Sequence, residues 1–180
     1  AHAMERIIFA NIETKGLKLH GLNVLHNKYA LERKKLEKTS SLRLLDDNRF
    51  KLDADFFYKS LEMKRIKKYS LENLKIKDIN RKWIDGNLYK LNECSPYLYL
   101  KGDKEAYKNY CEVNNATLKF DMSEDRYKGL INSMEQGFDV KNVPVIHGEN
   151  NILMDGQHRL CYLLAKYGED YEVTCLHVYF

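Results

Sequence analysis

The sequence predicts an α/β fold of the mixed α+β kind, and two observations support this expectation. The last third of the chain alternates between apolar runs of strand length and segments whose apolar residues recur at helical spacing. Hydrophobic residues make up 44% of the 180 residues and aromatic residues 12%, which is enough to fill a core. This length suits one domain, or one small domain with an added segment.

Residues 1–70 are expected to form a mainly helical N-terminal extension of an α/β domain at residues 71–180. Ala1–Ala3 reads as the remnant of a tag and is left out of the fold prediction. Asp53–Lys68 is typical of a helix that begins at an acidic cap and ends in basic residues. No apolar run reaches the roughly 18 residues of a membrane span, so a cytoplasmic protein is expected.

The middle of the chain carries weaker signals. Leu71–Ile79 alternates loosely between apolar and polar residues, which favours a strand. Gly86–Asn87 and Ser95–Pro96 are turn signals. Asp103–Asn114 is expected to form a helix with tyrosines along one side.

From Ser123 onward the sequence signals for helices and strands are clearer. Ser123 is a good N-cap, with acidic residues in the following turn and apolar residues at helical spacing as far as Gly137. A later helix is expected to turn Leu160 and Tyr167 inward and to stop at Gly168. The elements expected in order are a helix at 123–137, strands at 143–146 and 152–154, a helix at 157–167 and a strand at 172–178.

The segment Asp155–Arg159 lies where a buried strand runs directly into a helix. Gly156 permits a tight turn, and the N–H groups of the new helix favour an anion. His158 can donate hydrogen bonds, and the planar guanidinium of Arg159 can donate hydrogen bonds to phosphate oxygens. Asp155 can accept a proton from a substrate hydroxyl or bind a metal ion. These residue types in this order predict a phosphate site.

A purely structural reading of the same residues stays open. Asp155 would then only cap the helix, His158 would be exposed, and Arg159 would pair with Glu169 or Asp170. A helix N-terminus alone does not decide the matter, because most helix N-termini bind no anion.

The distribution of charge and the spacing of the cysteines indicate which classes of partner and site the sequence favours. Residues 1–90 carry 21 Lys and Arg against 12 Asp and Glu, a net +9, whereas residues 91–180 carry 9 against 14, a net −5. The basic half suits nucleic acid, a nucleotide or an anionic lipid, although a solvated lysine-rich helix face is the commoner cause of such a count. The four scattered cysteines lack zinc-ligand spacing and are expected to be buried thiols.

The stretch Val143–Gly168 resembles the core of the ParB/sulfiredoxin superfamily. In that family a strand of the type P-x-x-V, a turn, two hydrophobic residues before x-D-G-x-H-R, and a helix ending in glycine recur in order. With the preceding helix the resemblance covers about 60 residues. An upstream L-x-G-D-x-x-x-Y stretch, here Leu100–Tyr107, accompanies this variant in proteins encoded beside surface-polysaccharide biosynthesis genes.

The resemblance implies a function in general terms. Gln157 stands where sulfiredoxins have their cysteine, which argues against sulfiredoxin chemistry. ParB proteins bind CTP through a G-E-R-R turn, and free-serine kinases have a D-G-H-H-R turn, the nearest of the three. A nucleotide-dependent phosphotransferase is therefore expected, a small-molecule kinase using ATP or another nucleotide with Mg²⁺ on a hydroxylated metabolite of surface-polysaccharide biosynthesis. The alternative is a non-catalytic ParB-like module that binds a nucleotide or, less favoured, nucleic acid.

The expected site residues follow from the resemblance, except Arg126, which is a candidate because it starts the preceding helix. Asp155 and His158 are expected to be catalytic, with Asp155 also a candidate Mg²⁺ ligand. The expected nucleotide and phosphate ligands are Gly156, Gln157, His158, Arg159 and Arg126. A second catalytic carboxylate is expected upstream, and Glu93, Asp103 and Glu105 are its candidates.

Overall fold

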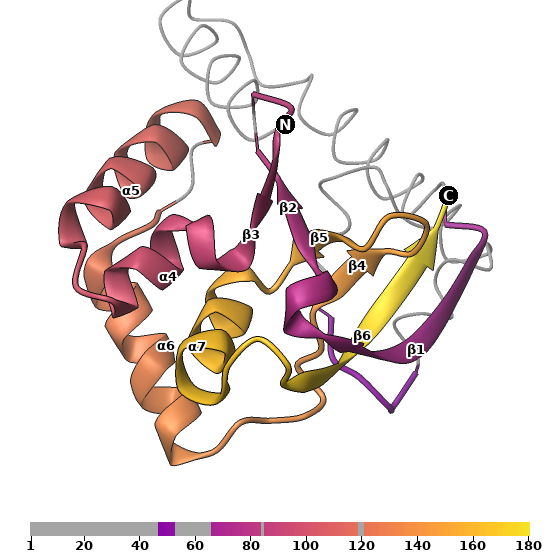
Figure 1. The fold of residues 1–180 in the computed structure, drawn as a ribbon. Coiled ribbons are helices and arrows are strands. Elements are labelled where there is room, and N and C mark those ends of the chain that lie inside the picture. The colour runs from indigo at the N-terminus through magenta and orange to yellow at the C-terminus, as the bar shows by residue number, and fades with distance from the viewer. Residues whose placement is uncertain (1–46, 53–65, 84, 119–120) are drawn as a thin grey trace, which may run out of the picture. The chain divides into compact units, whose positions relative to one another are not determined.

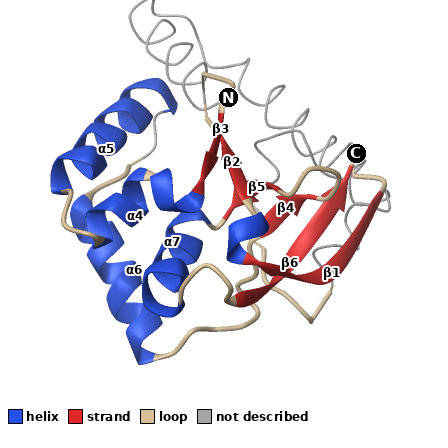
Figure 2. Cartoon of the chain, in the orientation of Figure 1, coloured by secondary structure: helices blue, strands red, loops and turns tan. Residues whose placement is uncertain are grey.

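A six-stranded mixed sheet with helices gathered on one side organises the part of the chain that the computed structural model describes (Figures 1 and 2). That part comprises residues 47–52, 66–83, 85–118 and 121–180. These residues belong to one compact unit. The predicted N-terminal extension lies mostly outside the described residues, as does most of the helix predicted for Asp53–Lys68.

The sheet combines antiparallel and parallel neighbours. In spatial order the strands are β1 (Lys68–Lys75), β6 (Glu172–Tyr179), β4 (Val145–His147), β5 (Ile152–Asp155), β2 (Asn80–Lys82) and β3 (Leu88–Lys90). Strand β6 pairs antiparallel with β1 and parallel with β4. Strand β5 pairs antiparallel with β4 and parallel with β2, and β2 pairs antiparallel with β3.

The helices of the described residues are η3 (Ile76–Asp78), η4 (Leu91–Glu93), α4 (Ser95–Leu100), α5 (Lys104–Leu118), α6 (Glu124–Gln136) and α7 (Gln157–Tyr167). Helix α7 is central to the helical layer, because it packs against α4, α6 and the short helix η4 (Figure 1). Its apolar side meets residues of β4 and β5 in the main core, among them Ile146 and Leu153. No helix in the described ranges is long and apolar enough to cross a membrane.

The mixed α/β class and the order of elements from Ser123 onward are confirmed, but three local predictions are wrong. Ser95–Pro96 is the first turn of α4, where proline's missing N–H costs no hydrogen bond. Tyr167 is 52% exposed and stacks on Tyr171 at 4.6 Å between ring centroids, instead of facing the core. Lys68, the predicted end of a helix, begins β1.

All four cysteines are free and buried, as predicted. Burial raises the pKa of the Cys94 thiol to about 11 and that of the Cys175 thiol to about 12, and it also raises the pKa of Cys111 and Cys161. Neutral, enclosed thiols pack as small apolar side chains. None of them is poised as a nucleophile.

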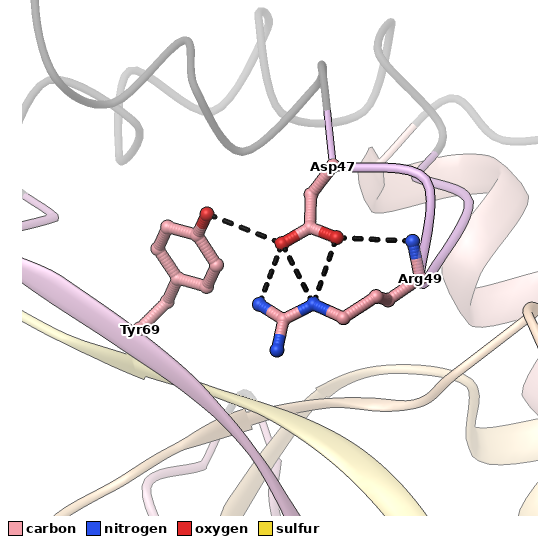
Figure 3. Close-up of polar contacts among 3 residues, drawn as sticks. All are labelled: Asp47, Arg49 and Tyr69. Atoms are coloured by element: carbon pink, nitrogen blue, oxygen red, sulfur yellow. Dashed lines mark hydrogen bonds and ion pairs between the residues drawn. The ribbon is translucent and has the colours of Figure 1, made fainter.

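The short segment 47–52 is tied to the sheet and to the loop after α6. Figure 3 shows the Asp47 carboxylate between the Arg49 guanidinium and the Tyr69 hydroxyl, and the Arg49 hydrogen bonds lower the pKa of Asp47 to about 2. Phe50 is buried with its ring edge-on to Tyr69. Lys51 pairs with Asp139 at 2.5 Å, and its backbone N–H donates to the same loop.

Replacing the cap of α6 tests the link from sequence to helix. The Ser123 hydroxyl accepts from the Arg126 backbone N–H at 3.3 Å, so Ser123→Ala is expected to lower the free energy of unfolding by about 1 kcal/mol. Ser133→Ala, at an exposed position inside the same helix, is the matched control and is expected to change it by less than about 0.5 kcal/mol. Urea denaturation measures both; equal losses would contradict the cap.

Candidate functional site

The turn from β5 into α7 depends on the backbone of Gly156. This residue is the N-cap of α7 with φ +97° and ψ 13°, a left-handed conformation that disfavours side chains. A Cβ placed there would lie 3.1 Å from the Cα of Pro144. The turn therefore needs glycine for its conformation and for its close contact with the chain before β4.

Arg159, near the start of α7, holds the β5–α7 connection in place through two hydrogen bonds. Its guanidinium donates to the Asp155 carboxylate at 3.2 Å and to the backbone carbonyl of Asn142 at 2.5 Å. The Arg159 side chain is 19% exposed and that of Asp155 39% exposed. Asp155 thus orients Arg159, and the N-cap of α7 is Gly156, which makes no side-chain cap hydrogen bond. The alternative partner Asp170 pairs instead with Lys75 and Lys77.

The side chain of His158 packs among a group of tyrosines. Its Nε2 lies 3.0 Å from the Tyr107 hydroxyl, and its ring packs edge-on to Tyr107, Tyr110 and Tyr127 at 4.9 to 5.9 Å between centroids. Tyr107 ends the upstream stretch Leu100–Tyr107, so this hydrogen bond joins the two stretches that carry the family resemblance. With Nε2 engaged, only Nδ1 of His158 is left to meet a ligand.

The charge at this end of α7 comes from arginines. Burial, with the nearby charges of Arg126 and Arg159, lowers the pKa of His158 to about 4, so the imidazole is neutral at pH 7. Arg126 is exposed on α6 and donates to the backbone carbonyl of Asp121. Arg126 and Arg159 are thus the cations that flank His158.

Arg81 on β2 holds the first residue of α7. Its Nε donates to the Gln157 side-chain oxygen at 3.0 Å, and its Nη1 donates to the backbone carbonyl of Leu153 at 3.1 Å. The parallel pairing of β2 with β5 brings these groups together. Two arginines, Arg81 on β2 and Arg159 on α7, therefore make hydrogen bonds at the start of α7.

A cavity of about 160 Å³ opens beside Gln157. Its walls come from the β2–β3 hairpin, the η4–α4 connection, α5 and α7. Trp83 packs on Tyr110, with 5.5 Å between ring centroids. The lining residues are Arg81, Trp83, Tyr89, Glu93, Cys94, Ser95, Tyr110 and Gln157.

The three candidate upstream carboxylates lie in different settings. Glu93 lines the cavity, and its Oε2 accepts from the Lys90 backbone N–H at 2.7 Å. Asp103 is exposed and accepts from the Ala106 N–H at the start of α5. Glu105 is exposed, 4.0 Å from Lys108. Only Glu93 of the three lines the cavity beside α7.

Asp155 is the residue that the sequence offers as a Mg²⁺ ligand. In the described ranges, no group of three or more His, Cys, Asp or Glu side chains is placed to hold a metal ion. The Asp155 carboxylate, already engaged by Arg159 through one oxygen, can offer one oxygen ligand to an ion that arrives with a ligand's phosphates.

The sequence identified the turn but not its surroundings. The structure brings Asp155, Gly156, His158 and Arg159 together at one helix end, with Arg126 near enough for its charge to act on His158. The roles of Arg81, Trp83 and Tyr110 were missed, because these residues reach the site only through tertiary packing. Comparison of the chain with models of protein families, with characterised proteins and with solved structures finds no significant match. The ParB/sulfiredoxin-like resemblance therefore stays a prediction.

Two glycines in different settings test the turn. Gly156 has φ +97°, and a Cβ there would lie 3.1 Å from the Cα of Pro144, whereas a Cβ on Gly129, inside α6, would meet nothing within 4 Å. Gly129→Ala is expected to raise the free energy of unfolding by about 1 kcal/mol, because alanine is the better helix former. Gly156→Ala is expected to lower it by at least about 1–2 kcal/mol from the left-handed backbone, and by more because of the contact with Pro144. A Gly156→Ala protein as stable as wild type in urea denaturation would contradict the close contact.

The low pKa of His158 predicts a pH dependence of stability. The folded-state pKa of about 4 lies below the unfolded value of 6.5, so this contribution is complete above pH 6.5 and is lost as the pH falls toward 4. Between pH 7 and pH 4, the free energy of unfolding of wild type is therefore expected to fall by on the order of 2 kcal/mol more than that of His158→Gln.

Denaturation of both proteins across this pH range measures the difference. His177, whose pKa burial also lowers, is present in both proteins and cancels in the comparison. Parallel stability profiles would show that His158 does not titrate as a buried imidazole.

Proposed function

We propose that this chain is a nucleotide-dependent phosphotransferase, a small-molecule kinase that acts on a hydroxylated metabolite, with surface-polysaccharide biosynthesis as the candidate setting. The observation that carries the proposal is the glycine turn into α7, where Asp155 and the Asn142 carbonyl hold Arg159 and where Arg81 is bonded to Gln157. Helix N-termini bind phosphate through backbone N–H groups and the helix dipole, and arginine is well matched to phosphate oxygens.

The backbone at Gly156 supports close approach of a phosphate group. In this proposal the amides that follow Gly156 bind one face of the phosphate, and Arg159, held in place by Asp155 and Asn142, reaches its oxygens from the side. Arg126 adds a second positive charge from α6. His158, neutral and bonded to Tyr107, positions this turn instead of supplying charge.

The proposed transfer needs a hydroxyl beside the phosphate. The acceptor oxygen attacks the terminal phosphorus, the new O–P bond forms as the bond to the leaving nucleoside diphosphate breaks, and the hydroxyl proton passes to a carboxylate. Glu93 in the cavity is available for that proton, and Asp155 at the turn is the alternative acceptor where it does not serve as a Mg²⁺ ligand. Positioning and charge neutralisation supply most of the rate in such reactions.

The residues present are compatible with Mg²⁺ brought in by the nucleotide. A bound magnesium ion would neutralise negative charge on the phosphates. Asp155 would supply one oxygen toward it while its other oxygen keeps Arg159 in place. The chain's own contribution to catalysis is thus to orient the phosphate and the hydroxyl and to hold the proton.

A thermal-shift experiment with a charge-neutral variant tests the phosphate site. ATP, CTP, GTP and pyrophosphate, each with Mg²⁺, are added to wild type, Arg126→Gln and Lys108→Gln. One nucleotide is expected to raise the melting temperature of wild type and of Lys108→Gln, an exposed cation on α5. Arg126→Gln is expected to bind about tenfold more weakly.

Binding and transfer are then separated by phosphorus NMR. Formation of nucleoside diphosphate that depends on an added acceptor supports a kinase. Binding without turnover across an acceptor panel favours the non-catalytic module. An unchanged melting temperature with every nucleotide, or equal increases in all three proteins, would contradict the proposed phosphate site.

A further inference from the structure

We infer that the cavity beside Gln157 is the acceptor site and that its ligand is a cyclic polyol of monosaccharide size; this inference rests on the proposed phosphotransferase function. The cavity, called the Trp83 cavity below, is the space of about 160 Å³ lined by the eight residues named above. Pockets for drug-sized ligands run to roughly 300–1,000 Å³, so this cavity suits a single small ring.

Position favours an acceptor over the base of the nucleotide. Gln157 lines the Trp83 cavity and is also the first residue of α7, where the phosphate would bind. An acceptor hydroxyl must come within about 3–3.5 Å of the reacting phosphorus. The base of a nucleoside triphosphate is separated from its terminal phosphorus by a ribose and two further phosphates. A cavity that shares a wall with the phosphate site therefore fits the acceptor.

The aromatic walls favour a ring. Trp83 and Tyr110 pack at 5.5 Å with an interplanar angle of 31°, and Tyr89 lines the cavity with its hydroxyl fixed by Asp85 at 2.8 Å. Aromatic faces carry partial negative charge. They attract the polarised C–H groups on the face of a sugar-like ring, and a rigid ring loses less conformational entropy on binding than a linear polyol.

The polar lining suits several hydroxyl groups at once. Glu93 can accept hydrogen bonds, Ser95 can donate or accept, and Arg81 can donate. Within the described residues, Arg81 uses two of its five N–H donors on Gln157 and Leu153. A donor and acceptor set of both kinds around an aromatic wall discriminates a polyol from an apolar ring of equal size.

The intrinsic fluorescence of the protein tests this assignment directly, because Trp83 is the only tryptophan in the chain. The probes are glucose, galactose, N-acetylglucosamine and myo-inositol as cyclic polyols, glycerol and L-serine as linear hydroxy compounds, and adenosine and cytidine as nucleosides. At least one cyclic polyol is expected to change the Trp83 emission with saturation, whereas the linear compounds and nucleosides leave it unchanged.

A pair of variants separates the cavity from a surface effect. Glu93→Gln is expected to weaken binding of that cyclic polyol about tenfold or more, because a charge-assisted hydrogen bond is lost. Glu135→Gln, an exposed carboxylate on α6, is the matched control and is expected to bind as wild type does. Equal binding by all three proteins would overturn the assignment.

Other outcomes also overturn it. Saturable emission changes with adenosine or cytidine alone would make the Trp83 cavity a base pocket. Changes with glycerol or L-serine alone would show that the ligand need not be a ring. Unchanged emission with every probe would show that the cavity binds none of these acceptors. The melting-temperature panel keeps the two proposals apart. Nucleotide binding without any Trp83 response defeats the acceptor assignment alone. A polyol response without nucleotide binding defeats the kinase and leaves a polyol-binding cavity that is not an acceptor site.

Discussion

Arg159 bridges the end of β5 and the loop before β4, and the geometry of the candidate site depends on this bridge. Its guanidinium holds the Asp155 carboxylate and the Asn142 carbonyl together, while the Gly156 backbone lies against Pro144. The same loop is held from outside by Lys51, which pairs with Asp139. An arginine fixed by two partners on separate segments has lost most of its conformational freedom before a ligand arrives, which lowers the entropic cost of binding.

The second constraint is the neutral histidine in the D-G-x-H-R turn. The tyrosines around His158 remove water from it, and this burial lowers the pKa of the imidazole to about 4, so that it is neutral at pH 7. Its partner Tyr107 belongs to α5, which also contributes Tyr110 to the Trp83 cavity. Positioning of the turn and the shape of the cavity are thus linked through one helix, while the positive charge resides on Arg81, Arg126 and Arg159.

Sequence reasoning succeeded where the physics is local. The Ser123 cap, the start of α7 at Gln157 and its stop at Gly168 each depend on a few neighbouring residues, and the structure has all three. It failed where distant segments meet. Arg81 and Gln157 are 76 positions apart and Tyr107 and His158 are 51 apart, so no periodicity could pair them. The burial of His158 by tyrosines is invisible in a linear pattern, so the neutral state of its imidazole could not be predicted.

The central claim is that phosphate binds the amides that begin α7. The most direct measurement is a titration of ¹⁵N-labelled protein with magnesium pyrophosphate, followed by amide chemical shifts. We expect saturable shifts at the amides of Gly156, Gln157, His158 and Arg159, with the amide of Gly168 at the far end of the helix unmoved. Unchanged amides at the start of α7, or shifts confined to other surfaces, would contradict it.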